Sequence, residues 1–221
     1  MKRFSAILFL AACAWTQVAT NANKQYQTHE GREAVAKGLA DPARDERQKP
    51  RELIEAMEIK PGMAVADVGT GVGYMIPFLS RAVGPNGKVY AEDIQTDFLD
   101  KAKQRAKLSN VANATFILGT PENANLPADT LNAILVLDVY HHFDYPDQML
   151  AGLHDSLLNG GRIYIVDYYR NEKAMPNGRA LEHIRLDRDA VIDEVQANRF
   201  RLAWKRDHIA DVQYILAFDK K

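Results

Sequence analysis

From residue 50 onward, apolar stretches typical of strands alternate with helical patterns, and this alternation constrains the fold more than any other feature. Such alternation predicts a parallel sheet covered by helices on both faces. The stretch 130–139 is mostly apolar, as expected for a strand buried on both sides. Strands are expected at 63–69, 88–94, 114–119, 130–139 and 162–169. Helices are expected at 51–59, 74–83, 96–110, 146–158 and 188–198.

Two more expected strands, 200–207 and 212–218, close the chain without a helix between them. Such a pair predicts an antiparallel hairpin at one end of the sheet. The predicted fold class is therefore α/β: a Rossmann-like, doubly wound, seven-stranded sheet, mostly parallel, with one antiparallel strand in a C-terminal hairpin. We expect residues 50–221 to form this domain.

The N-terminus differs in composition from the rest. Lys2 and Arg3 precede an apolar run, 4–12, that is shorter than the roughly 20 residues needed to span a bilayer. This pattern predicts a secretory signal within residues 1–22. The sequence LAAC, ending at Cys13, resembles the bacterial lipobox, which implies cleavage before Cys13 and its lipidation. Cleavage after Ala22 is the alternative.

Export would place the protein in the periplasm or on a membrane anchored through Cys13; an uncleaved anchor facing the cytoplasm is the less favoured alternative. Residues 23–49 are expected to form a tether and short helices, and the polar segment 16–31 to be flexible. With 28 basic and 29 acidic residues and no long basic run, no nucleic-acid partner is expected. The oligomeric state stays open.

The stretch VADVGTGVGY, residues 65–74, marks the expected ligand site. Gly69, Gly71 and Gly73 follow the first strand of the domain, where open α/β sheets bind ligands. The spacing is G-x-G-x-G, whereas a dinucleotide fingerprint is G-x-G-x-x-G. Asp67 would repel a pyrophosphate and favours a ligand with an ammonium group.

The stretch resembles motif I of the class I S-adenosylmethionine-dependent methyltransferases, D/E-x-G-x-G-x-G. The resemblance continues in LVLDVYHHF and NGGRIYIVD and covers about residues 50–170. It implies S-adenosylmethionine as the cofactor, with its amino group held by Asp67 and its methionine part lying along the glycine loop. The implied contacts of that loop are Gly69, Thr70, Gly71 and Gly73.

The same resemblance assigns further cofactor contacts. Asp93 ends the second strand and is expected to bind the ribose hydroxyls. Glu92 is the alternative, because strand alternation lets only one of the two face the site. The loop 119–127 is expected to cover the adenine through Thr120 or Glu122. Asp138, at the end of the fourth strand, is also placed on the cofactor side.

The stretch DVYHHFDY, residues 138–145, is expected to lie on the acceptor side. His141 or His142 could act as a general base near neutral pH, with Tyr140 beside them. Packing at the strand end is the alternative for both histidines. The spacing of His141, His142 and Asp144 matches no common metal-ligand pattern, so no metal is expected.

The predicted function is S-adenosylmethionine-dependent methyl transfer to an unidentified acceptor, expected to be a small molecule or associated with the cell envelope. The alternative is a non-catalytic module of the envelope that binds S-adenosylmethionine or a nucleoside. The presence of Asp67 and Asp93 does not distinguish these two functions, because both need the same binding loop.

Overall fold

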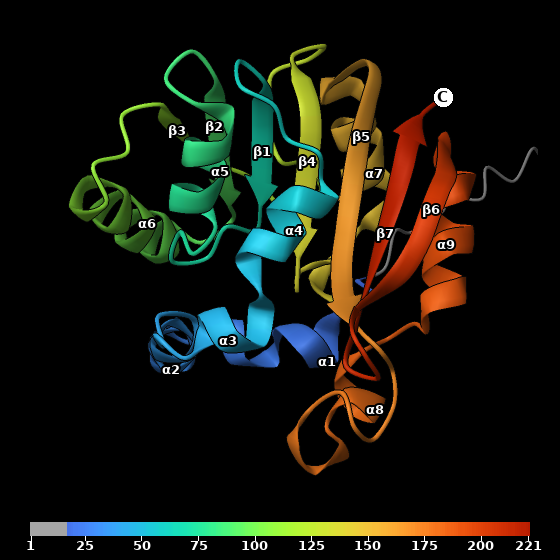
Figure 1. The fold of residues 1–221 in the computed structure, drawn as a ribbon. Helices are drawn as coiled ribbons and strands as arrows, with labels where there is room; N and C mark the ends of the chain where they lie inside the picture. The colour runs from blue at the N-terminus through green and yellow to red at the C-terminus, as the bar shows by residue number, and fades with distance from the viewer. Residues whose placement is uncertain (1–16) are drawn as a thin grey trace, which may run out of the picture.

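The computed structural model describes residues 17–221, so the expected signal segment and Cys13 lie outside the described residues. Residues 17–221 contain seven strands in one sheet, in the order β3-β2-β1-β4-β5-β7-β6 (Figure 1). The strands are β1 (Ala64–Val68), β2 (Lys88–Asp93), β3 (Ala114–Leu118), β4 (Leu131–Leu137), β5 (Leu157–Tyr168), β6 (Phe200–Ile209) and β7 (Gln213–Lys220). Neighbouring strands from β3 to β5 pair in parallel, and β7 is antiparallel to both β5 and β6. The predicted fold class is confirmed.

The strand order reverses between β1 and β4, which are neighbours in the sheet although β2 and β3 separate them in sequence. The chain runs outward from β1 to β3 and then returns to β4. At such a switch point the two outgoing loops diverge and leave a crevice at the carboxyl ends of the strands. The fold therefore locates the expected site between the loops after β1 and β4.

Alternation along β1 divides its side chains between two cores. Val65 packs with Leu53 and Leu79 on one face, whereas Ala66 and Val68 belong to the core on the other face. The first face is covered by α4 (Pro50–Ala56), α5 (Ile76–Val83) and α6 (Thr96–Leu108). The second is covered by α7 (Pro146–Ser156) and α9 (Arg188–Ala197).

Residues 17–48, which we call the N-terminal cover, are helical even within 17–31, where we expected a flexible segment; the short helices farther along agree with the tether and short helices expected over 23–49. They contain α1 (Thr20–Asn23), η1 (Lys24–Gln27), α2 (His29–Leu39) and α3 (Arg44–Gln48), which lie across the carboxyl ends of the strands (Figure 1). Ala19 and Ala22 are buried. The Ala19 N–H donates to Asp144 Oδ1 at 3.2 Å, and Asn23 Nδ2 to the His142 carbonyl at 3.0 Å. These partners lie more than 100 residues away, so the local pattern could not reveal them.

Three shorter elements complete the described chain: η2 (Tyr140–His142), η3 (Pro176–Gly178) and α8 (Ala180–His183). The first follows β4, and the other two lie in the long connection between β5 and α9. None of the helices in residues 17–221 has the length and apolar character required to cross a membrane.

Candidate active site

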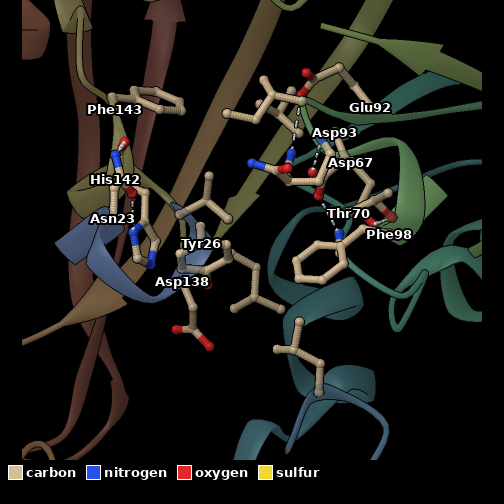
Figure 2. A pocket seen from close by; sticks show the side chains of 18 of the residues that line it. Asn23, Tyr26, Asp67, Thr70, Glu92, Asp93, Phe98, Asp138, His142 and Phe143 are labelled. Atoms are coloured by element: carbon tan, nitrogen blue, oxygen red, sulfur yellow. Dashed lines mark hydrogen bonds between the residues drawn. The ribbon is translucent and has the colours of Figure 1, made fainter. Parts of the chain in front are cut away.

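A cavity of about 360 Å³ opens at the carboxyl edge of the sheet, between the strand ends and the N-terminal cover. This volume lies within the range of small-molecule sites. Figure 2 shows two opposed sides. We call one the acidic side (Asp67, Glu92, Asp93 and the glycine loop) and the other the histidine side (Asn23, Tyr26, His142 and Phe143).

The glycine loop has the left-handed backbone conformation that its three glycines suggest. Gly69, Gly71 and Gly73 have φ values of +67°, +57° and +77°, a region in which a side chain would be strained. The Gly71 N–H donates to Asp93 Oδ2 at 2.8 Å, which joins the loop to the end of β2. Gly69 and Gly71 line the cavity, as does Thr70. Gly73 instead lies against α6, where a Cβ would be 3.0 Å from Ala102.

Three carboxyl groups are buried together on the acidic side. Burial raises the pKa of Asp67 to about 6, although Thr70 Oγ1 donates a hydrogen bond to Asp67 Oδ2 at 2.6 Å. Burial likewise raises the pKa of Asp93 to about 6 and that of Glu92 well above its ordinary value. Among the described residues, Glu92 Oε1 has no hydrogen-bond partner.

Both Glu92 and Asp93 line the cavity, whereas we expected strand alternation to admit one of them. The reason is that Asp93 is the last residue of β2, where the chain leaves the pleat. The expectation holds only inside a strand. Asp93 Oδ1 also accepts from the Gln95 N–H at 2.9 Å, which fixes the carboxylate at the start of the following loop.

The donor set on the acidic side fits S-adenosylmethionine. Buried carboxylates that crowd one wall favour a ligand with cationic groups and would disfavour a phosphate. Asp67 would hold the amino group and Asp93 the ribose diol. Apolar side chains of Ile94, Phe98 and Pro121 line the same cavity and suit a flat ring.

Thr120 and Glu122, the expected adenine contacts, lie outside the described cavity lining, and Pro121 between them lies within it. Thr120 Oγ1 accepts from the N–H groups of Glu122 and Asn123, at 3.3 and 3.0 Å. The Thr120 hydroxyl therefore stabilises the turn after β3 instead of pointing toward a ligand.

Asp138 lines the cavity in a left-handed conformation, with φ of +57°. Its carboxylate accepts hydrogen bonds from Gln48 Nε2 of the N-terminal cover and from Gln213 Nε2 of β7, and Arg44 Nη2 lies 3.7 Å from it. Burial raises the pKa of Asp138 to about 6. Asp138 thus joins three distant parts of the chain at the middle of the site.

His142 is the one residue of the predicted histidine pair that lines the cavity in the described structure. The Asn23 amide donates to the His142 carbonyl, and its Oδ1 lies 2.8 Å from His142 Nδ1 (Figure 2). Because Asn23 Oδ1 is an acceptor, Nδ1 carries the proton and Nε2 keeps its lone pair. Burial and the neighbouring His141 and His183 hold the pKa of His142 well below its ordinary value.

The other two acceptor-side candidates point elsewhere. His141 Nδ1 lies 2.7 Å from Asp167 Oδ1 in a buried pair, and the Tyr140 hydroxyl donates to Glu194 Oε1 at 2.6 Å. In the described residues neither side chain is part of the cavity lining. The structure therefore separates His141 and Tyr140 from the cavity and leaves His142 facing it.

Sequence reasoning missed the contribution of the N-terminal cover and of α8. Asn23, Tyr26, Leu39 and Arg44 all line the cavity. The ring of His183 in α8 lies beside the rings of both His141 and His142, with centroids 5.0 and 5.4 Å away. A polar segment without helical periodicity offers no local signal for such contacts.

Residues 59–217 match a family described as "Methyltransferase domain". Curated relatives include a protein-L-isoaspartate O-methyltransferase of Ignicoccus hospitalis, 32% identical over 84 residues, 38% of this chain and 40% of that protein. A ubiquinone/menaquinone biosynthesis C-methyltransferase UbiE of Marinomonas sp. is 27% identical over 128 residues, 57% of this chain and 50% of that protein. The matches thus span half or less of these relatives' lengths.

Solved structures share the fold at low identity. A SAM-dependent methyltransferase from Aquifex aeolicus matches with a TM-score of 0.77 and 24% identity over 84% of this chain and 96% of that one. The [4+2]-cyclase SpnF matches with a TM-score of 0.66 and 12% identity over 78% and 80% of the two chains. The second likeness illustrates that the fold alone does not define a reaction.

The acid-and-glycine loop on a sheet of this topology defines the class of S-adenosylmethionine-dependent enzymes. The match over residues 59–217 shows that the chain belongs to the methyltransferase family. The predicted family and cofactor, S-adenosylmethionine, are confirmed.

Proposed function

We propose that the protein transfers the methyl group of S-adenosylmethionine to a small acceptor bound in the cavity. One observation carries this proposal: the acidic side and the histidine side face each other across a single cavity (Figure 2). A cofactor held by Asp67 and Asp93 would direct its sulfonium toward the middle of that cavity. An acceptor would then occupy the space beside His142.

The chemistry is an in-line displacement. A lone pair of the acceptor atom forms a bond to the methyl carbon while the carbon–sulfur bond breaks, and the sulfur keeps the electron pair and becomes a neutral thioether. An acceptor that arrives protonated must lose that proton, and the free Nε2 of His142 would take it. The protein's contribution is otherwise orientation and exclusion of water.

The N-terminal cover favours a small acceptor or a small group of a larger molecule. Tyr26 and Asn23 lie over the strand ends, and Tyr26 is half-buried, with its ring 4.9 Å from that of His142. A folded protein or a nucleic-acid duplex would have to displace these helices to reach the cavity. A compact metabolite would not.

The start of the described chain supports an acceptor at the cell envelope. Gln17 lines the cavity and follows Cys13 by four residues. Lipidation of Cys13, which lies outside the described residues, would attach the enzyme to a membrane close in sequence to this wall of the cavity. An enzyme anchored there would face acceptors that dissolve in or gather at the membrane.

Burial of Ala19 and Ala22 favours the cleavage site before Cys13 over the one after Ala22. Cleavage after Ala22 would remove Ala19, and with it the hydrogen bond from its N–H to Asp144. Cleavage before Cys13 would preserve the whole N-terminal cover. Mass spectrometry of the N-terminus of the native protein distinguishes these products and detects an acyl group on Cys13.

The test of the function combines binding with turnover. Calorimetry with S-adenosylmethionine measures cofactor affinity, and transfer of a labelled methyl group into envelope extract and into cytosolic metabolites measures activity. Labelling of a small or lipid-soluble molecule supports the proposal. Tight binding without labelling of either extract would favour the non-catalytic binding module instead.

A further inference from the structure

Three imidazole rings from two separate segments meet beside the cavity. His141 and His142 belong to η2, and His183 ends α8, about 40 residues later. One ring nitrogen of each lies within 4.8 Å of one from each of the other two. The sequence pairs His141 with His142 but shows no signal that α8 brings the third ring to them.

The first two rings are held in one tautomer. His141 Nδ1 donates to Asp167 Oδ1 at 2.7 Å, and His142 Nδ1 donates to Asn23 Oδ1 at 2.8 Å. Their free nitrogens are therefore both Nε2. A histidine that binds a metal commonly donates its other ring N–H to a carboxylate or carbonyl oxygen in this way, which fixes the ring and makes the free nitrogen a better ligand.

The charged groups around the three histidines have opposite effects on a bound cation. The buried carboxylate of Asp167 favours a cation beside His141, and it is held in place by the N–H groups of His141 and Tyr168, at 3.0 and 2.8 Å. The guanidinium of Arg179 acts against a cation at His142 and His183. Neutral imidazoles with one adjacent carboxylate suit a divalent ion that prefers nitrogen ligands more than Mg²⁺ or Ca²⁺, which prefer oxygen.

We propose that His141, His142 and His183 form a binding site for a divalent transition metal of the zinc type. Tetrahedral Zn²⁺ with bonds of about 2.1 Å sets its nitrogen ligands about 3.4 Å apart. From separations of up to 4.8 Å, the rings must approach by at most about 1.4 Å. His183 lies in a short, half-exposed helix, so the third ligand can move without disturbing the sheet.

Such a site goes beyond the proposed methyl transfer. Three protein ligands leave the fourth tetrahedral position open, as in catalytic zinc sites. His142 lines the cavity, so this position lies next to the space assigned to the acceptor. A metal held by His141, His142 and His183 would supply a Lewis acid that lowers the pKa of an acceptor proton, and that proton would leave to solvent. With the metal bound, the lone pair of His142 Nε2 would serve as a ligand, and the metal would take over the role proposed above for that nitrogen in removing the acceptor's proton.

The test uses metal alone, without cofactor or acceptor, so that it is independent of methyl transfer. The full chain, stripped with chelator, is titrated with Co²⁺ and then with Zn²⁺. We expect one equivalent of Co²⁺ to give the visible absorption bands of a tetrahedral site, and Zn²⁺ to abolish them. His183→Ala and His142→Gln should each weaken Co²⁺ binding by more than about 100-fold, and Asp167→Asn by about 10–100-fold.

The matched control is His29→Ala, which removes an exposed histidine at the start of α2 and should leave Co²⁺ binding unchanged. Circular dichroism and cofactor binding establish that each variant is folded, and the partly exposed His183 decides the outcome if the His142 variant unfolds. The proposal is wrong if the wild type shows no tetrahedral bands. It is also wrong if His183→Ala binds Co²⁺ as tightly as His29→Ala does.

Discussion

The two sides of the cavity are built in different ways. The acidic side comes from two neighbouring strand ends, with Asp67, the glycine loop and Asp93 lying within 27 residues of one another in sequence. The histidine side assembles η2 with the N-terminal cover, and its contacts, such as Asn23 with His142, join residues 119 positions apart. A local motif therefore specifies the acidic side, and long-range packing specifies the histidine side. Variants on the two sides should accordingly affect different steps.

The largest expected effect is on the histidine side. His142→Ala should lower the rate of label transfer from S-adenosylmethionine into envelope extract by about 10²–10⁴-fold, because it removes a nitrogen that would serve as base or metal ligand. Cofactor affinity should change little. Single-turnover rates at saturating cofactor measure the step, and thermal unfolding measures stability. A lower melting temperature with full turnover per folded molecule would make His142 a packing residue instead.

The next effect is on the acidic side. Asp67→Ala and Asp93→Ala should each weaken binding of S-adenosylmethionine by about 1–3 kcal/mol, roughly 5- to 150-fold, through loss of charge-assisted hydrogen bonds. Calorimetry measures this. Asp100→Ala, an exposed carboxylate on α6, is the matched control. If both cavity variants bound as tightly as the control, the assignment of the acidic side to the cofactor would fail.

The pH dependence of cofactor binding should follow the acidic side. In the ligand-free protein the pKa values of Asp67 and Asp93 are about 6, and a cationic ligand binds the ionised carboxylates. Affinity should be flat above pH 7 and fall by about tenfold per pH unit below pH 6 for each carboxyl involved. Titrations from pH 5 to 8 test this, and a flat profile would contradict it.

The ligand-free protein should show the opposite trend in stability. Because Asp67, Asp93 and Asp138 bind protons more tightly when folded than the ordinary aspartate pKa of 3.8 implies, their contribution to folding stability increases as pH falls from about 6 to about 4. Chemical denaturation across that range, without cofactor, measures the sum over the protein. Asp138→Asn should reduce the change, since it removes one of the three titrations.

The smallest expected effect concerns the contact between the N-terminal cover and His142. Asn23→Ala removes the side-chain contacts of α1 with His142 and should accelerate amide hydrogen exchange in residues 17–27 by about 2- to 13-fold, the equivalent of 0.5–1.5 kcal/mol. Affinity for S-adenosylmethionine should change by less than about twofold. Equal acceleration in β1 and β4 would show that the N-terminal cover and the sheet open together, which would remove the distinction between the two sides.

Much of the fold and of the cofactor side could be predicted from the sequence. The alternation of strand and helix patterns predicted seven strands and an antiparallel β7. The spacing of Asp67 with three glycines favoured a cationic ligand over a dinucleotide. One difference from the expected site is local, because the Thr120 hydroxyl accepts hydrogen bonds within its own turn. The others arise where a residue's position depends on a distant partner: His141 pairs with Asp167, 26 residues away, and His183 reaches η2 from α8. A single strand or turn contains no trace of those partners.

The sharing of Asp138 between Gln48 of the N-terminal cover and Gln213 of β7 has a consequence for the timing of turnover. The N-terminal cover is held by scattered hydrogen bonds, such as those of Ala19 and Asn23, and by a small apolar cluster around Ala36, whereas the opposite wall belongs to the backbone ladder of the sheet. Segments held in this way open on a shorter timescale than a core strand does. Ligands should therefore exchange while the N-terminal cover opens transiently. When methyl transfer itself is fast, release of the demethylated cofactor should then limit the turnover number.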